Sequence, residues 1–439
     1  MPADPDEIAD VVLRQFKKLP AKRRPQVRDN GLHEWVPLSG LVAEKDGVLT
    51  CLSLATGMKC LPASKLPLAK GNALHDWHAE VLAVRAFNRH LLDECDTYSQ
   101  GISSPTSAIV TRRPPSAISP ASPQPFAIRD DVTLHMYCSE APCGDASMEL
   151  TMAAQEDASP WEVPPSTSSS TTSPAVTTST PAPDPGTTTD KKSAPLPGRA
   201  YFSHLGIVRR KPARGDAPPT TSKSCSDKLA LKQCTSLLAS LTSLLIHPTN
   251  AYISSLILPE SEYSATGCER AFSERGRMKA AADEAAQWKG GYRFSPFEVR
   301  STTRVFEYSK RSVRGRVGAD KIAASNLAAV WTLNGRVDEG TMGGVLQGRK
   351  AFDVRGASLV SRRRMWELAA AVAERLAGEE LNDEDEVGGL LRRALDVDMY
   401  GEVKGGEILA CRREVKEAVR RVALAGWVVN VGDEEFARL

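Results

Sequence analysis

The sequence predicts an α/β layer architecture that is followed by a mainly helical C-terminal part. Segments with the period of a half-buried strand alternate along the chain with segments of helical period, as in proteins whose helices layer on a sheet. Near the C-terminus, "SRRRMWELAAAVAERL" and "ACRREVKEAVRRVALAGW" have helical spacing. The chain has 439 residues, of which 41% are hydrophobic, so it can bury a substantial core. We therefore expect one large folded domain.

The first predicted element is a helix, and two short strands are predicted further along the chain. The stretch "DEIADVVLRQF" places Ile8, Val12 and Phe16, with Val11, on one side of a helix, so we interpret it as amphipathic and not as a targeting segment. The short apolar runs "VLTCLSL" at 48–54 and "AYISSLIL" at 251–258 predict strands.

The central elements carry the residues on which the functional argument depends. "HAEVLAVRAFNRHLL" has apolar residues at helical spacing, so a helix is predicted to begin at His78. "DVTLHMYCSE" (131–140) alternates apolar and polar residues, which predicts a strand with one buried face. This strand leads directly into "PCG" and then into another helical stretch. His78 and Cys143 are therefore both expected where a helix begins.

Two stretches are rich in serine, threonine and proline and poor in large apolar residues. They are an insert at 99–126 and an insert at 158–198, which contains "PSTSSSTTSPAVTTSTPAPDPGTTTD". Such segments cannot bury enough apolar surface to offset the entropy of an ordered chain, so both are predicted to be disordered. Because neither flank looks self-sufficient, we interpret them as inserts within a single domain that spans 1–439.

Charge and cysteine content argue against several classes of protein. The formal net charge of +2 neither requires nor forbids a nucleic-acid partner. Nine cysteines at irregular spacing, with no signal peptide, argue against a secreted disulfide scaffold. No apolar run approaches the roughly 20 residues that a membrane span needs. We expect an intracellular protein, in the cytoplasm or nucleus, that binds no membrane.

His78, Glu80 and Cys143 together form a motif typical of zinc sites that activate water for deamination. A catalytic zinc ion takes three protein ligands and keeps a fourth position for water. His78 and Cys143 are two candidates, because the start of a helix favours a thiolate. Glu80 is expected to stay off the metal and to move protons from water to the base and the leaving ammonia. The usual signature ends in Pro-Cys-x-x-Cys, but Ala146 stands at its last position.

The third ligand must therefore come from another part of the chain. Cys138 is expected to pack in a strand, and Cys95 and Cys234 lie in segments without a polar setting. Cys225 directly precedes a leucine-rich helix that Ser226 or Asp227 could cap, which repeats the setting of Cys143. On spacing and setting, Cys225 is the preferred candidate.

A structural interpretation of each of these motifs competes with the chemical one. His-x-Glu is common by chance, and a buried cysteine is usually a small hydrophobic residue. Taken alone, each motif is more often structural than functional. Their joint occurrence, each at a junction between a strand and a helix, favours the metal site.

The motifs "HAE", "PCGD" and "SCSDK", in this order and with a long gap before the third, resemble those of the adenosine-to-inosine RNA deaminases. The stretches "EWVPLSGLVAEKDGVLTCLSLATGMKCLPASKL" and "GNALHDWHAEVLAVRAFNRHLL" are similar to the branch of this family that acts on tRNA, in particular to a fungal member. The resemblance covers most of the chain apart from the two inserts. It implies a cytidine-deaminase-like core, which is a mixed sheet flanked by helices, with a helical C-terminal extension. It also implies that His78, Cys143 and Cys225 bind Zn²⁺ and that Glu80 is the proton shuttle.

The resemblance further implies that inositol hexakisphosphate is buried in the domain as a structural cofactor. The matching positions are Arg85, Lys228, Arg362, Tyr400, Lys404 and Trp427. Lys228 lies one turn after Cys225 and is expected to connect this anion through Asp76 to the metal. The sequence departs from the family pattern at Val84, Leu231, Lys232 and Asn430, so fewer groups are expected to contact the phosphates.

Substrate and reaction are also implied by the resemblance. Lys59 matches a lysine that approaches the substrate phosphate, although its neighbour Met58 replaces a threonine. In the tRNA branch the target is the adenosine immediately 3′ of the anticodon of alanine tRNA, position 37, which is deaminated to inosine. Editors of double-stranded RNA carry RNA-binding domains upstream, and fewer than eighty residues precede His78 here. A compact RNA with a splayed-out loop base is thus the expected partner, and DNA is not.

Two other classes of function stay open at this point. The first is a deaminase of another RNA or of a free nucleoside, which would use the same zinc chemistry. Deaminases of free nucleosides are generally far shorter than this chain and supply Pro-Cys-x-x-Cys. The second class is a non-catalytic RNA-binding protein stabilised by zinc, and Glu80 argues against it because a structural zinc site needs no such carboxylate.

Overall fold

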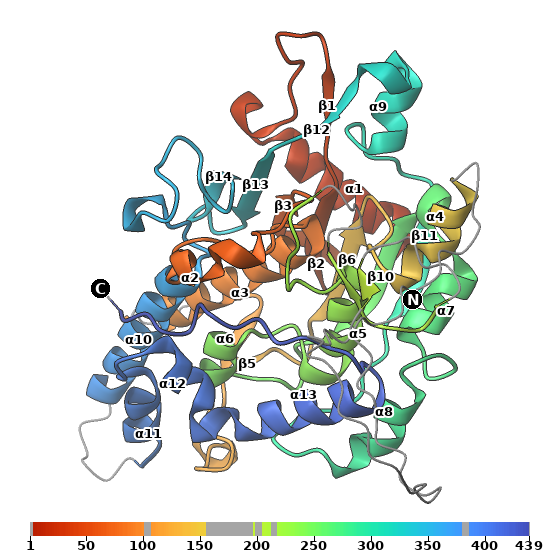
Figure 1. The fold of residues 1–439 in the computed structure, drawn as a ribbon. Coiled ribbons are helices and arrows are strands. Elements are labelled where there is room, and N and C mark those ends of the chain that lie inside the picture. Colours follow the sequence, from red (N-terminus) through yellow and green to blue (C-terminus); the bar gives the residue numbers. More distant parts are fainter. Residues whose placement is uncertain are drawn as a thin grey trace, which may run out of the picture.

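The computed structural model describes residues 3–100, 107–154, 196–197, 204–211, 217–379 and 386–438, and its centre is an eight-stranded sheet (Figure 1). In sheet order the strands are β11 (Glu298–Thr302), β10 (Ile253–Pro259), β6 (Thr133–Cys138), β2 (Leu38–Lys45), β3 (Val48–Thr56), β13 (Leu327–Thr332), β14 (Asp338–Met342) and β15 (Val345–Leu346). β6, β10 and β11 run parallel, whereas β2 pairs antiparallel with both β6 and β3. This mixed sheet confirms the predicted fold class.

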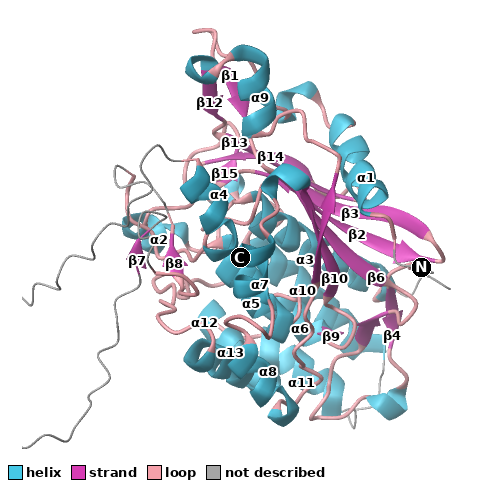
Figure 2. Ribbon diagram, turned by 90° about the vertical axis from the view of Figure 1, so that its right-hand side faces the viewer, coloured by secondary structure: helices cyan, strands magenta, loops and turns pink. Residues whose placement is uncertain are grey.

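Helices cover both faces of the sheet (Figure 2). On one face lies α1 (Pro5–Lys17), which buries Ile8, Val12 and Phe16 as its apolar spacing predicts. Gly40 in β2 lets this helix approach closely, because a Cβ atom there would lie 2.7 Å from Cγ1 of Val12. On the other face lie α3 (Ala79–Tyr98), α5 (Cys225–Thr235) and α10 (Arg362–Glu379), around a large apolar core.

Because both faces of the sheet are covered, the expectation that β6 has a single buried face is wrong. Leu134, Met136 and Cys138 pack into the core beneath α3, as the alternation predicts. Two of the three alternate residues are not solvated, however: Tyr137 is fully buried in the core beneath α1, and His135 is 2% exposed, while Thr133 is exposed. The polar atoms of these two side chains suggest a solvated face. The rings of Tyr137 and His135 are nevertheless buried, because neighbouring elements cover them.

The C-terminal part is helical, as expected. It consists of α10, α11 (Glu386–Leu395), α12 (Tyr400–Gly405) and α13 (Ala410–Val422). The other short helices are α2 (Leu66–Ala69), α4 (Met148–Ala153), α6 (Ser240–Leu245), α7 (Ala265–Phe272), α8 (Lys279–Glu284) and α9 (Lys310–Val317). None of the described helices is both long enough and apolar enough to span a membrane.

Small sheets complete the fold, and one of them falls inside a predicted insert. β4 (Val110–Arg112) and β5 (Phe126–Ile128) pair with each other and with β9 (Ile246–His247). The expectation of disorder over 99–126 is therefore wrong for its second half, where Val110 and Phe126 supply apolar contacts that the serine-rich composition obscures. The insert at 158–198 lies outside the described residues, apart from β7 (Leu196–Pro197), which pairs with β8 (Arg209–Arg210).

Candidate active site

The loop before α3 is tied closely to the loop that follows β3. The backbone N–H groups of Trp77 and Ala79 donate to the carbonyls of Lys59 and Gly57, at 3.0 and 2.9 Å. Gly57 has φ +140°, and a Cβ atom there would lie 2.1 Å from the Trp77 carbonyl oxygen. This close approach holds His78 at the N-cap of α3, where the carboxylate of Asp76 accepts a hydrogen bond from its backbone N–H at 3.0 Å.

The two cysteine segments are also held together by glycine and serine. The hydroxyl of Ser226 donates to the Pro142 carbonyl at 2.9 Å, and the Ser226 N–H donates to the Cys143 carbonyl at 3.0 Å. Gly144 has φ +108°, and a Cβ atom there would lie 2.3 Å from the hydroxyl of Ser224. Cys225 is the first residue of α5, and Ser224 caps this helix in place of the predicted Ser226 or Asp227.

These contacts bring His78, Cys143 and Cys225 together, although up to 147 positions separate them in sequence. One ligand atom from each lies within 4.8 Å of the other two, and Sγ of Cys143 is 3.8 Å from Nδ1 of His78. In a tetrahedral zinc site, bond lengths of about 2.0–2.3 Å place neighbouring ligand atoms roughly 3.5–3.8 Å apart. The donor set and its spacing are therefore compatible with zinc.

A second set of atoms overlaps the first. Cys60, Asp76 and His78 also lie within 4.8 Å of one another. Asp76 is already engaged by cations, because its Oδ2 accepts from Lys211 at 2.9 Å and from Lys228. The group with both Cys143 and Cys225 is thus the better metal site.

The groups that surround Cys143 favour its thiolate form. A hydrogen bond from Cys225, with Lys211 and His78 nearby, holds the pKa of Cys143 well below its usual value, in opposition to burial. Burial and Lys211 lower the pKa of His78, but the thiolate of Cys143 and the carboxylate of Asp76 outweigh them and raise it to about 10. A bound metal ion replaces these protons, because it needs neutral imidazole and thiolate.

Glu80 lies in the first turn of α3, two residues after His78, and is 6% exposed. Burial, together with the neighbouring Cys143 thiolate, raises its pKa. A carboxyl group with a raised pKa exchanges protons more readily near neutral pH. The raised pKa is compatible with a proton shuttle, and this role of Glu80 stays a prediction.

Asp76 is the centre of a buried polar network that the sequence revealed only in part. Its Oδ2 accepts from Lys211, Lys228 and the hydroxyl of Ser222, the last at 2.5 Å. Lys211 also donates to Sγ of Cys225 at 3.2 Å, and its side chain is 5% exposed. Lys211 was not predicted, since it lies between a low-complexity insert and a loop and no local pattern distinguishes it from a surface lysine.

Three of the residues predicted to bind inositol hexakisphosphate lie on the C-terminal helices, namely Arg362 in α10 and Tyr400 and Lys404 in α12. Arg362 and Lys404 form ion pairs with Asp433 (2.9 Å) and Glu434 (3.2 Å). The rings of Tyr400 and Trp427 face cations: Arg362 lies 5.9 Å from the first, and Lys223 and Arg420 each lie 5.1 Å from the second. Arg85 donates to the carbonyl of Val360 at 2.8 Å.

Further cations that the sequence analysis missed join these residues. We call the whole set the cation cluster: Arg85, Lys223, Lys228, Lys232, Arg362, Lys404, Arg412, Lys416 and Arg420. Burial and neighbouring cations lower the pKa of Lys416 to about 6 and that of Lys223 to about 7. The same causes hold the pKa of Lys232 well below its usual value. Such mutual repulsion is the environment that a buried polyanion would relieve.

Lys59 follows β3 beside the metal-ligand loop, where its side chain donates a hydrogen bond to Oδ1 of Asn326. Its backbone carbonyl accepts a hydrogen bond from the N–H of Trp77, so Lys59 directly contacts the segment that carries His78. The contact of Lys59 with substrate phosphate stays a prediction.

Comparison with known proteins gives a consistent result. The family model of the adenosine-deaminase (editase) domain matches residues 53–431. The tRNA-specific adenosine deaminase 1 of Schizosaccharomyces pombe is 33% identical over 432 residues, which cover 97% of this chain and 95% of that protein. Proteins of the same name match over shorter stretches: 33% identity in Saccharomyces cerevisiae (53% of each chain), and 26% identity in Mus musculus (57% of this chain, 47% of that protein).

Proposed function

The chain belongs to the adenosine-deaminase (editase) domain family and is a deaminase, and we propose that it converts adenosine to inosine in tRNA by zinc-dependent hydrolysis. The substrate class rests on the likeness to a tRNA-specific deaminase over nearly the whole of both chains. We further propose the adenosine 3′ of the anticodon of alanine tRNA, position 37, as the target. This choice follows the resemblance to the tRNA branch.

The observation that carries the reaction is the meeting of His78, Cys143 and Cys225 next to Glu80. These three side chains would hold the zinc ion, which when bound activates a water molecule for attack on C6 of the base. Glu80 accepts a proton from this water and delivers protons to the purine and to the departing amino group. Adenosine and water are consumed, and inosine and ammonia are released.

The network around Asp76 has a positioning role in this proposal. Asp76 orients the backbone of His78, and Lys211 links the Asp76 carboxylate to Cys225. Such contacts behind the metal ligands fix their orientation and charge. Lys59 is assigned to the substrate side, where its ammonium group would contact phosphate.

Inositol hexakisphosphate is the second proposed cofactor. The mutual lowering of pKa values in the cation cluster supports it, because a ligand with many phosphate groups would neutralise several of these side chains at once. Lys228 belongs both to this cluster and to the Asp76 network, so it would join the anion to the metal site. The ligand would then be part of the folded core.

The test is an inosine assay on total tRNA and on alanine tRNA with the wild-type protein and with Glu80→Gln. We expect the substitution to abolish inosine formation while zinc content and melting temperature stay close to wild type, because glutamine keeps the shape but cannot carry the proton. Inosine at wild-type levels in Glu80→Gln would refute the assigned role. Deamination of free adenosine at a rate equal to that of tRNA would refute the substrate class.

A further inference from the structure

A small basic lobe forms the top of the molecule in both overall views (Figures 1 and 2). It consists of residues 310–324, which include α9 and β12 (Ile322–Ala324), together with β1 (His33–Trp35), which pairs with β12. Its exposed cations are Lys310, Arg311, Arg314, Arg316 and Lys321. Neither Arg314 nor Arg316 forms an ion pair within the part of the chain that the structure describes.

No acidic residue of the first turn balances the cations of α9, although Arg311 pairs with Glu262 at 3.7 Å and the ammonium of Lys310 lies 5.7 Å from the ring centre of Trp35. Lys310 and Arg311 stand in the first turn, where the helix dipole disfavours cations, and no acidic residue accompanies them. Lys310 and Arg314 are like charges at positions i and i+4, which repel each other on a helix surface. Val313 is the buried residue of this helix. Arg314 and Arg316 stand in the last turn, where the helix dipole favours cations, but both are exposed and neither is paired among the described residues, so their charge is available to an anionic partner.

The basic lobe is attached to both loops that form the candidate active site. The backbone N–H of Lys310 donates to the carboxylate of Glu140 at 2.9 Å, and Glu140 lies three residues before Cys143. Just after β12, Asn326 accepts the hydrogen bond from Lys59. These two hydrogen bonds tie the start of α9 to the loop that leads to Cys143, and the residues that follow β12 to Lys59.

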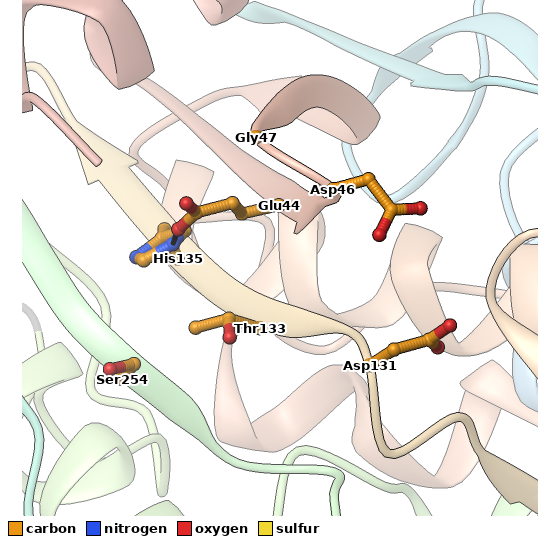
Figure 3. A pocket seen from close by; sticks show the side chains of 7 residues that line it. All are labelled: Glu44, Asp46, Gly47, Asp131, Thr133, His135 and Ser254. Atoms are coloured by element: carbon orange, nitrogen blue, oxygen red, sulfur yellow. Dashed lines mark hydrogen bonds and ion pairs between the residues drawn. The ribbon is translucent and has the colours of Figure 1, made fainter. Parts of the chain in front are cut away.

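The opposite end of β6 has the opposite charge. A pocket of about 350 Å³ at the start of this strand is lined by Glu44, Asp46 and Asp131, with His135 deeper inside (Figure 3). Glu44 contacts the imidazole of His135 at 3.1 Å, as Figure 3 illustrates. Cys143, by contrast, follows the end of β6. Asp131 is paired with Lys45 and Arg129, so this end offers an RNA backbone no excess of cations, whereas the basic lobe does.

We propose that the basic lobe binds the phosphate backbone of the substrate RNA next to the extruded adenosine, with Arg314 and Arg316 as its principal contacts. This inference rests on the proposed function and adds to it the surface that holds the RNA. Phosphate contacts of this kind set the position of the RNA and contribute little sequence specificity. Their loss should weaken the binding of different tRNAs alike.

The test measures the dissociation constant of the full-length protein for an alanine tRNA transcript over a range of salt concentrations. We expect Arg314→Glu/Arg316→Glu to weaken binding by about tenfold or more at low salt and to reduce the slope of log K against log salt by about 2, one for each lost phosphate contact. The matched control is Arg392→Glu/Arg393→Glu. These arginines are exposed on α11, which lies at the other end of the molecule in both views.

The control carries the same change in net charge, so the difference between the two variants reports the local contact. Equal losses of affinity, or an unchanged salt slope in the α9 variant, would overturn the proposal. The milder Arg314→Ala/Arg316→Ala, with wild-type melting temperature and zinc content, should give a smaller loss in the same direction.

Failure of this inference and failure of the proposed function can be distinguished. RNA binding that depends on the lobe without inosine formation refutes the proposed function alone, whereas full activity at limiting tRNA in the α9 variant refutes this inference alone.

Discussion

The charges around Asp76 and the charges of the cation cluster are both at least partly buried, but only the first set is internally balanced. In the first set, Asp76 lies between Lys211 and Lys228, and Lys211 also contacts Cys225. Burial alone would raise the pKa of Asp76, yet these lysines hold it well below its usual value. Burial likewise opposes the charge of Lys211, but Asp76 and the neighbouring Cys143 and Cys225 raise the pKa of this lysine. Each charged form is stabilised by its neighbours.

In the cation cluster the neighbours act in the opposite direction. Lys416 faces Arg412, Arg420, Lys404 and Lys223, and with burial they lower its pKa to about 6. Asp433 and Glu434 balance only Arg362 and Lys404 among the cluster members. The comparison indicates that the Asp76 network is balanced by its own residues, whereas the cation cluster carries an excess of positive charge that a bound anion would relieve.

The largest effect is expected from a substitution that disrupts the balanced network around Asp76. Lys211→Met should reduce the free energy of unfolding by about 3–5 kcal/mol, because it leaves the Asp76 carboxylate buried with one cation fewer. Urea unfolding of the wild-type and variant proteins measures this change. The exposed Lys22→Met is the control, for which we expect a change within about 0.5 kcal/mol. A loss of less than about 1 kcal/mol in Lys211→Met would show that the network is not balanced as the contacts indicate.

An intermediate effect is expected in the cation cluster. If inositol hexakisphosphate binds there, adding it at a hundred times its dissociation constant should stabilise the folded protein by about 2.7 kcal/mol. Lys416→Met should reduce this gain and, without the anion, should leave the protein as stable as wild type or more so, because a repelling charge is removed. Thermal melts with and without the ligand, and mass spectrometry of the purified protein for the bound anion, measure both results. Equal destabilisation of the variant in the two conditions would contradict this interpretation.

The smallest expected effect, taken per pH unit, is a dependence of stability on pH. Unfolded lysine keeps its proton up to about pH 10.4, whereas folded Lys416 loses it above about pH 6. Between these values the unfolded chain binds more protons than the folded one, so stability rises with pH, by at most about 1.4 kcal/mol per unit for this group. Bound polyanion keeps the lysine charged and removes the slope. Unfolding free energies of wild type and Lys416→Met from pH 6 to 9 test this, since the variant should lack this part of the slope.

Local sequence patterns were sufficient for most individual elements. The helix after His78, the strand before Cys143 and the helical C-terminal part follow from apolar spacing and from capping residues a few positions apart. The preference for Cys225 came from its setting before a helix, and the structure brings it to the other two candidates. Burial of both faces of β6 was not visible, because the alternation of a strand does not say what covers each side.

What the sequence by itself determined is which residue types could carry the chemistry: a histidine and two cysteines at helix starts, and a carboxylate two positions from the histidine. Only the tertiary structure decided which charges meet. Lys211 reaches Asp76 across 135 positions, and the cation cluster gathers residues from Arg85 to Arg420. The physical reason is that helix and strand periods encode which side of an element is buried, whereas electrostatic balance depends on distances between elements far apart in the chain.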